Sequence, residues 1–425
     1  MDRLVKLPEG LPRSQSDPSD IDFHRYLSEI SRYSDGVDPV RNPFAPGAGL
    51  PPPALVGRDH ELRGAAVALE RLAQRRPARG AVFAGVRGVG KTALLNEIRR
   101  IVTTRAWIHA KVEGGSSGRF RDSLAQSLNS SLRTATAAVG SGALDRALAV
   151  FKSFSLAAAD DGSLALGIDV DPAGGVANTG NLAIDLTELL GELGAAAATL
   201  GVGCALLIDE LQELASDEVA ALAGAVHDAT QLGLPVVVFA AGLPNVPDLL
   251  VEAHGYGERL FDLQTIDAFD DERAAEALTR ATAIEHVGWT GDAIRFVLDA
   301  AKGHPYFLQV YGKHVWDFAL ASPISGADAR AGVAAGRSEL DRAFFGARWQ
   351  RATAAQQEYL RAMATVSDHR GQARSSTVAR HLGRTLSALS STRDQLLRKG
   401  YVYAPGRGTI AFTTPGMADY IAARS

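Results

Sequence analysis

The sequence predicts an α/β protein with a parallel, doubly wound sheet, followed by a helical region and a C-terminal helix-turn-helix with a β wing. Three observations support this fold class. Apolar runs at 204–209 (CALLID) and 234–242 (LPVVVFAAG) are typical of parallel strands buried on both faces. A glycine-rich turn joins a strand predicted at 80–85 to a helix predicted at 91–102. After Phe269 the apolar residues recur at helical spacing.

Length and composition limit the class of protein. The chain has 425 residues, of which 46% are hydrophobic, so it can form two to four domains with cores of their own. A single cysteine, Cys204, excludes an internal disulfide and a cysteine-rich zinc site, and is typical of a reducing compartment. The longest uncharged, apolar-looking run, 193–208, is shorter than the roughly 20 residues of a membrane span, and the N-terminus lacks an apolar signal segment. We therefore expect a cytoplasmic protein with no membrane partner.

Local patterns divide the chain into four regions. We expect a tail with an amphipathic helix at 20–33 in residues 1–45, and an α/β core at 46–268 that carries an insertion at about 113–203. A helical lid is expected at 269–345, and the helix-turn-helix module at 346–425.

The order of elements follows from the same patterns. In the core we predict a helix at 61–76, the strand–helix pair above and a strand at 107–112. The insertion contains two helical stretches, a hairpin-like segment with its turn at 160–162, and a helix near 182–200. Helices follow at 271–282, 291–302 and 305–321, then at 354–366, 375–382 and 386–399, before a wing built on YVYA, PGRG and TIAFTT.

The turn after the first strand has the spacing G-x-x-x-x-G-K-[ST] of a phosphate-binding loop. Glycines let the backbone N–H groups surround a phosphate at a positive helix N-terminus. The lysine adds a positive charge, and the threonine hydroxyl is a ligand for Mg²⁺. The candidate nucleotide-binding residues are Gly85, Val86, Arg87, Gly88, Val89, Gly90, Lys91, Thr92 and Ala93.

Two acids follow the apolar run 204–208. Asp209 and Glu210 stand at the C-terminal end of a buried strand, which is the edge where ligands bind in open α/β sheets. We expect Asp209 and Thr92 to hold Mg²⁺, and Glu210 to orient or deprotonate an attacking water. The alternative is a pair of acids that stabilises the dipole of a following helix.

Together these residues resemble the AAA-plus and STAND branch of P-loop ATPases, in particular bacterial relatives of origin-recognition initiator ATPases. The resemblance covers most of the chain and implies a P-loop NTPase core, a helical lid and a C-terminal winged helix. LVGRDHEL at 55–62 looks like the entry motif that lies against adenine, which implies contacts from Val56, Gly57 and Arg58. GHPYFLQ at 303–309 looks like a STAND lid motif, which implies nucleotide sensing by His304 and Pro305 or an ordinary turn there.

Two features concern catalysis. Arg259 in YGERLFDL matches the position of an arginine finger that acts on a neighbour's nucleotide, and the alternative is a structural residue that braces the lid. The strand at 234–242 ends without the usual polar sensor, and the nearest amide is Asn245. We therefore expect slow turnover.

The C-terminal module is basic. Residues 370–425 contain nine Arg or Lys residues against two Asp residues, a net charge of +7 within a chain of net charge −4. In the expected recognition helix, Leu386, Leu389, Leu396 and Leu397 should face the core. Arg393 and Arg398, with Arg407 in the wing, are candidate contacts to double-stranded DNA. Protein contact or regulation is the alternative use of this module.

Two functional hypotheses result. The first is an ATP-binding, slowly hydrolysing, Mg²⁺-dependent switch that couples its nucleotide state to DNA or to a protein partner. The second is an ATP-dependent signalling or defence scaffold that forms homo-oligomers and does not bind DNA. A phosphotransferase is disfavoured because the sequence has no acceptor-binding signature and no lid arginine cluster.

Overall fold

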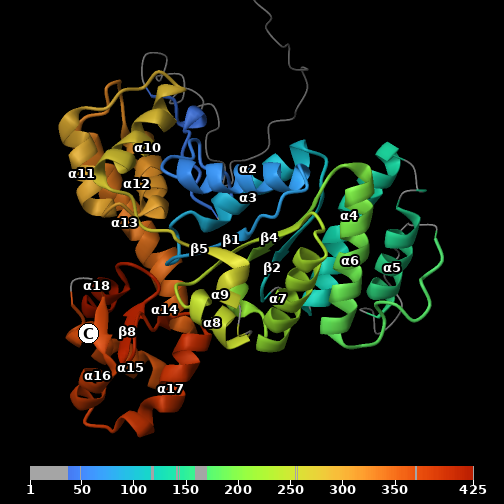
Figure 1. The fold of residues 1–425 in the computed structure, drawn as a ribbon. Coiled ribbons are helices and arrows are strands. Elements are labelled where there is room, and N and C mark those ends of the chain that lie inside the picture. The colour runs from blue at the N-terminus through green and yellow to red at the C-terminus, as the bar shows by residue number, and fades with distance from the viewer. Residues whose placement is uncertain are drawn as a thin grey trace, which may run out of the picture.

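The computed structural model describes residues 37–424 except 48, 116–118, 140, 141, 143, 158–169, 254, 256, 369 and 370. The helix predicted at 20–33 and the turn predicted at 160–162 lie outside the described residues. Figure 1 shows a central sheet with helices on both faces, a helical group beside it, and the C-terminal elements below that group.

A five-stranded parallel sheet forms the core. Its order is β2 (Ile108–Glu113), β3 (Cys204–Asp209), β4 (Val236–Gly242), β1 (Gly80–Ala84) and β5 (Phe261–Thr265). Every residue of β1, β3 and β4 is buried, as the apolar runs predict. The prediction did not include β5, an edge strand in which Phe261 alone is buried, so that its sequence carries no apolar run.

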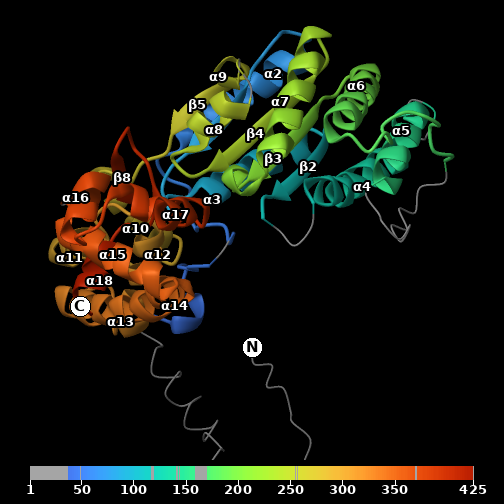
Figure 2. The same ribbon diagram turned by 90° about the horizontal axis from the view of Figure 1, so that it is seen from below.

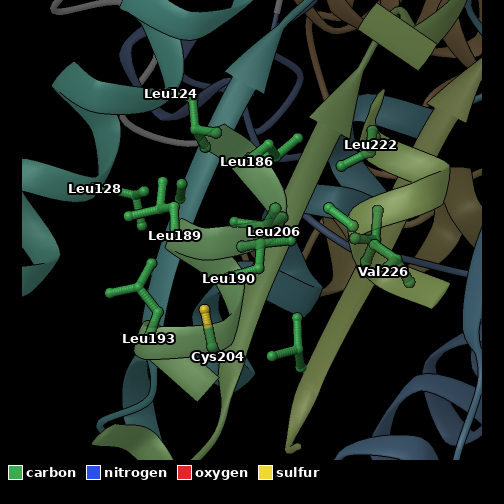
Figure 3. Close-up of a cluster of buried hydrophobic side chains, with 14 of the residues drawn as sticks. Leu124, Leu128, Leu186, Leu189, Leu190, Leu193, Cys204, Leu206, Leu222 and Val226 are labelled. Carbon is green, nitrogen blue, oxygen red and sulfur yellow. The ribbon is translucent and has the colours of Figure 1, made fainter. Parts of the chain in front are cut away.

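Helices cover both faces of the sheet, which confirms the predicted architecture. On one face, α2 (Asp59–Ala73) and α3 (Lys91–Thr104) pack on strand residues such as Phe83 and Phe239. On the other, α4 (Phe120–Val139), α6 (Leu182–Leu200) and α7 (Ser216–Gln231) enclose β3. Figure 3 shows leucines of α4 and α6 and residues of α7 converging around Leu206. The expected insertion supplies α4, α5 (Asp145–Leu156) and α6, so it builds part of this core.

A helical group follows the sheet. After α8 (Val246–Ala253) and α9 (Gly257–Leu260), the chain forms α10 (Asp271–Ala283), α11 (Gly291–Ala301), α12 (Pro305–Phe318) and α13 (Gly326–Glu339). The first described residues pack on α12. They include the 3-10 helix η2 (Pro39–Arg41), and the Trp316 indole N–H donates to the Asp38 carbonyl at 2.8 Å. The segment before the core is therefore bound to the helical group.

The C-terminal elements combine three main helices with a small antiparallel sheet of order β6-β8-β7. They are η4 (Leu340–Gly346, a π-helix), α14 (Ala347–Arg351), α15 (Ala354–Val366), β6 (Gln372–Arg374), α16 (Ser375–His381), α17 (Leu386–Arg398), β7 (Val402–Tyr403), β8 (Thr409–Phe412) and α18 (Met417–Ala422). These bounds agree closely with the helices predicted at 354–366, 375–382 and 386–399.

One continuous apolar core joins α10–α13 to the C-terminal elements, which lie side by side in Figures 1 and 2. Phe345 links them, with ring centroids 6.1 Å from Phe307 of α12 and 5.3 Å from Tyr420 of α18. The predicted inward position of Leu386 is wrong. Its side chain is 53% exposed because it begins α17, whereas Leu389 and Leu396 are buried one and three turns later. None of the described helices is long and apolar enough to cross a membrane.

Candidate functional site

The backbone of the glycine-rich loop at 85–92 has two left-handed residues. Gly88 has φ +80° and Gly90 has φ +94°, a region that glycine adopts without steric cost. A Cβ atom on Gly88 would lie 2.4 Å from Cε1 of His304, whereas one on Gly90 would meet no atom within 4 Å. Gly88 is therefore required by conformation and packing, and the space around Gly90 is open.

Lys91 is the first residue of α3 and is almost fully buried. Its Nζ donates to the carbonyls of Gly85 and Val86, each at 2.9 Å. Burial lowers the pKa of Lys91 to about 8, while Glu210 and Asp209 act in the opposite direction. The lysine charge is thus held by loop carbonyls, which a phosphate group can replace as its partners.

The two acids stand where the sequence predicts them. Asp209 ends β3 and is buried, and its Oδ1 accepts from the Glu210 N–H at 3.0 Å. Glu210 has φ +49°, which is unusual for a residue with a side chain. Such strain is often found at functional sites.

Glu210 has two side-chain partners that the sequence interpretation missed. Arg87 Nη1 lies 3.3 Å from Glu210 Oε1, and its Nη2 lies 3.9 Å from Glu213 Oε1. Gln212 donates to Glu210, and its Oε1 accepts from the Leu243 N–H just after β4. The sequence signal for the contact with Gln212 was its position two residues after Glu210. In the described chain, the Oδ1 of Asn245 is buried without a partner.

The entry segment contacts the loop through Arg58. Its Nη2 donates to the carbonyls of Val89 and Asp267, each at 2.9 Å, and its guanidinium lies 5.0 Å from the Phe269 ring centroid. Gly57 adopts φ +67°, and Val56 is buried. Arg58 therefore ties the loop to the chain that leads into α10, and the expected adenine contact of 56–58 stays a prediction.

The segment containing His304 and Pro305 also reaches the loop. His304 Nε2 donates to the Arg87 carbonyl at 2.8 Å, and the Tyr306 N–H donates to Gly88 O at 3.1 Å. Burial lowers the pKa of His304 to about 4, with Lys91 adding to this effect and the bond to Arg87 opposing it. His304 is therefore neutral at pH 7. Pro305 occupies the first turn of α12, where its missing N–H costs nothing.

Arg259 lies near the N-terminal ends of the parallel strands, whereas the phosphate loop lies at their C-terminal ends. It belongs to α9, directly before β5, and Phe261 of β5 pairs with Gly80 at the start of β1. The loop follows the other end of this five-residue strand, about 15 Å away at 3.3 Å per residue. Arg259 is exposed. It lies away from its own loop, and its role as a finger or as a structural residue stays a prediction.

The C-terminal module touches the loop directly. The Arg87 N–H donates to the carbonyl of Thr413 at 3.0 Å, and a Cβ atom on Gly400 would lie 2.9 Å from Arg87 Nη2. Burial, then Arg87, lowers the pKa of Arg348 in α14 to about 10, with Glu210 acting in the opposite direction. Sequence patterns did not indicate these contacts, because the partners are far apart along the chain.

The three arginines predicted to contact DNA differ in their exposure. Arg398 and Arg407 are exposed. The Arg393 side chain is 28% exposed, lies 3.6 Å from Asp394, and has an Nε that is buried without a partner in the described chain. Arg393 is therefore turned partly into the module.

The residues present fit a nucleotide with a bound metal ion. Gly90 leaves open space beside the buried Lys91. Asp209, which ends β3, is buried, and Thr92, in the first turn of α3, is half-buried. Among the described residues, no cluster of three or more His, Cys, Asp or Glu side chains could hold a metal ion. Protein ligands to Mg²⁺ would then be few, with nucleotide and water oxygens completing its shell.

Comparisons with known proteins agree with this geometry. Residues 54–239 match the family model described as an AAA ATPase domain, and residues 342–421 match a domain of unknown function, DUF8462. No curated protein matches the chain. The Walker-type ATPase PABY2304 of Pyrococcus abyssi is a similar solved structure, with 16% identity, a TM-score of 0.57, and coverage of 87% of this chain and 96% of that one.

Two further structures are more distant. Thermotoga maritima RuvB, a Holliday junction branch migration motor, has 16% identity and a TM-score of 0.43 over 88% of this chain and 99% of its own. Cdc6p of Pyrobaculum aerophilum has 14% identity and a TM-score of 0.45 over 92% of this chain and 98% of its own. Residues 54–239 are thus similar to AAA ATPase domains, and the chain shares the fold of the Pyrococcus abyssi ATPase.

Proposed function

We propose that the chain is an ATP-dependent switch in which bound nucleotide controls the position of the C-terminal module, residues 346–425. The observation that carries this proposal is the hydrogen bond of 3.0 Å from the Arg87 N–H to the Thr413 carbonyl. Backbone N–H groups of such a loop are the groups that bind phosphate. A module that engages one of them is sensitive to whether a phosphate is present.

The predicted nucleotide-site and metal-site residues have the following roles in this proposal. Residues 85–93 bind the phosphates, with Lys91 as their cation, and 56–58, His304 and Pro305 enclose the rest of the nucleotide. Thr92 and Asp209 would hold Mg²⁺, which would neutralise charge on the phosphate oxygens. Glu210 orients the attacking water as a general base. Its contacts with Arg87 and Gln212 must change for it to act, which is consistent with slow turnover.

Arg87 couples the site to the module. Its carbonyl accepts from His304, its guanidinium lies beside Glu210 and Gly400, and its N–H contacts Thr413. A neutral hydrogen bond contributes about 1 kcal/mol, and a charge-assisted bond to phosphate about twice that. A triphosphate would therefore compete successfully for this end of the loop and release the module.

A pair of glycine substitutions tests the coupling. Gly400 has φ +62° and abuts Arg87, whereas Gly408 has φ +78° and would place its Cβ within 4 Å of no atom. Gly400→Val should weaken docking and raise ATP affinity about three- to tenfold in calorimetry, since each tenfold corresponds to about 1.4 kcal/mol. Gly408→Val carries a similar backbone strain and should leave ATP affinity unchanged. Equal effects of the two variants would disprove docking on the loop.

We propose that the module is a winged helix and that it binds double-stranded DNA when released. Its net charge of +7 over residues 370–425 and the exposed Arg398 and Arg407 support this partner. A DNA shift assay at several salt concentrations should show binding with ATP and much weaker binding with ADP. Each phosphate contact adds about −0.9 to the salt slope. Absence of binding in both nucleotide states would contradict the proposal that the module binds DNA.

Arg259 favours a second candidate, an ATP-dependent oligomerising scaffold. Its exposed position at the sheet edge opposite its own loop suits contact with a neighbouring subunit's nucleotide. Under this candidate, ATP should increase the mass in solution measured by light scattering, and Arg259→Ala should prevent the increase. A monomer with and without ATP would exclude it.

A further inference from the structure

A second concave site lies at the β2 edge of the sheet, between α3 and α4. Its cavity has a volume of about 540 Å³, within the range of roughly 300–1,000 Å³ found for small-molecule sites. None of the phosphate-loop residues 85–92 lines it, and neither do Asp209 and Glu210. The cavity is therefore separate from the nucleotide site, and the proposed switch makes no use of it.

Serines of α4 satisfy the donors of the edge strand. The Lys111 N–H donates to Ser127 Oγ and the His109 N–H donates to Ser131 Oγ, each at 2.8 Å. Edge strands with free donors attract a further strand, but here two outward N–H groups already have partners. The cavity is consequently suited to a small molecule and not to an extended peptide.

The same helix keeps the cavity open. One face of α4 carries Leu124, Leu128 and Leu132, which are completely buried in the core. The face toward the cavity carries small side chains instead, including Ser130 and Ala135. Larger side chains on this face would fill the space, so the volume is a consequence of the residues placed here.

The polar wall of the cavity is cationic. Arg99, His109 and Lys111 line it, and among the described residues no Asp or Glu does so. Lys111 Nζ has a neutral partner, Asn96 Oδ1 at 2.6 Å. Burial is the largest cause that lowers the pKa of Lys111, Asp209 opposes it, and Arg99 adds to the lowering. Two cations thus lie near each other in the lining, and the acids that act on Lys111, Asp209 and Glu113, lie outside it.

Another part of the wall is apolar. Trp107 is buried, and its ring lies against the Gly203 backbone, where a Cβ atom would come within 2.4 Å of Cζ3. Leu200 and Val202 continue this wall beside the tryptophan. A flat apolar body can rest here while a charged group reaches the cationic wall.

We propose that this cavity binds a small organic anion, with its carboxylate or phosphate at Arg99 and Lys111 and its apolar body along Trp107, Leu200 and Val202. Binding requires both the cationic wall and the apolar wall. Inorganic phosphate alone would leave the apolar wall in water, and a neutral aromatic compound would leave the two cations without an anion.

Calorimetry on the full chain tests the proposal with four probes: 2-naphthoate, 2-naphthyl phosphate, the neutral 2-naphthamide and inorganic phosphate. The Lys91→Ala background removes the phosphate loop as a competing site. At least one naphthyl anion should bind, and the amide and inorganic phosphate should each bind at least about tenfold more weakly, a difference of about 1.4 kcal/mol. The preferred anion identifies the head group.

Two adjacent arginines of α3 provide the matched control. Arg99 lines the cavity, whereas Arg100 does not and instead pairs with Glu97 at 2.6 Å. Arg99→Met should weaken the bound anion about fivefold or more, and Arg100→Met less than twofold, with circular dichroism confirming that both variants fold. Equal effects of the two substitutions, equal binding of naphthamide and naphthoate, or no binding of either anion would overturn the proposal.

Discussion

The phosphate loop and the β2-edge cavity each place a lysine near an arginine, buried at the loop and half-buried in the cavity, and the two sites differ in how these charges are paired. At the loop, Glu210 and Glu213 lie near Arg87, and Glu210 and Asp209 support the charge of Lys91. In the cavity, the described lining contains no acid to pair with Arg99 and Lys111. A ligand at the loop must therefore displace internal partners, which couples binding to rearrangement. A ligand in the cavity can bind to a wall that is already formed.

The largest expected effect separates the two sites. Lys91→Ala should lower ATP affinity at least about 100-fold, because a buried cation on the phosphates is worth about 3 kcal/mol. Binding of a naphthyl anion in the cavity should not change. Fluorescent-ATP titration measures the first effect and calorimetry the second. Arg63→Ala, at an exposed position of α2, is the control, and unchanged ATP affinity in Lys91→Ala would remove the loop from nucleotide binding.

Catalysis should depend on one of the two acids near Arg87. Glu210→Gln keeps the shape of the side chain but removes its basicity, so the steady-state hydrolysis rate should fall about 100-fold while ATP affinity stays within about threefold. Glu213→Gln is the matched control, because Glu213 also lies near Arg87, at 3.9 Å. Its turnover should remain close to that of the unmodified protein. If both variants hydrolyse ATP equally well, Glu210 is not the catalytic base.

The free energy of unfolding should depend on pH through His304, which contacts the phosphate loop. Its pKa is about 4 in the folded chain against 6.5 for an unperturbed histidine, so the unfolded chain binds the proton more readily. The stabilisation is present above pH 6.5 and is lost as the pH falls toward 4, by at most about 3 kcal/mol. Urea unfolding should show a smaller loss over this window for His304→Gln. His381→Gln, at an exposed position, is the control, and should keep the full loss.

The smallest expected effect concerns the cavity wall. Ser127→Ala removes the acceptor of the Lys111 N–H and should lower the free energy of unfolding by about 1 kcal/mol. Ser130 lines the same cavity from an exposed position and accepts no hydrogen bond on its Oγ in the described chain. Ser130→Ala should therefore be neutral. Equal stabilities in urea would show that water replaces the serine at the strand edge.

The core and the loop could be predicted because their signals are local. Continuous apolar runs identify β3 and β4, and the loop spacing places Lys91 at a helix start, where the structure has it. The edge strand β5 has no such run and was missed. Leu386 was placed in the core because its spacing fits, although the first residue of a helix extends beyond the packed turns.

By itself, the sequence determined the parallel sheet, the strand–loop–helix unit and the basic C-terminal module, since each depends on residues that are neighbours in the chain. The tertiary structure decided which groups meet. It brought Thr413 to the Arg87 N–H, placed Arg259 at the far edge of the sheet, and assembled the cavity from α3, β2 and α4. Such contacts depend on packing between distant segments, and no local period or spacing encodes them.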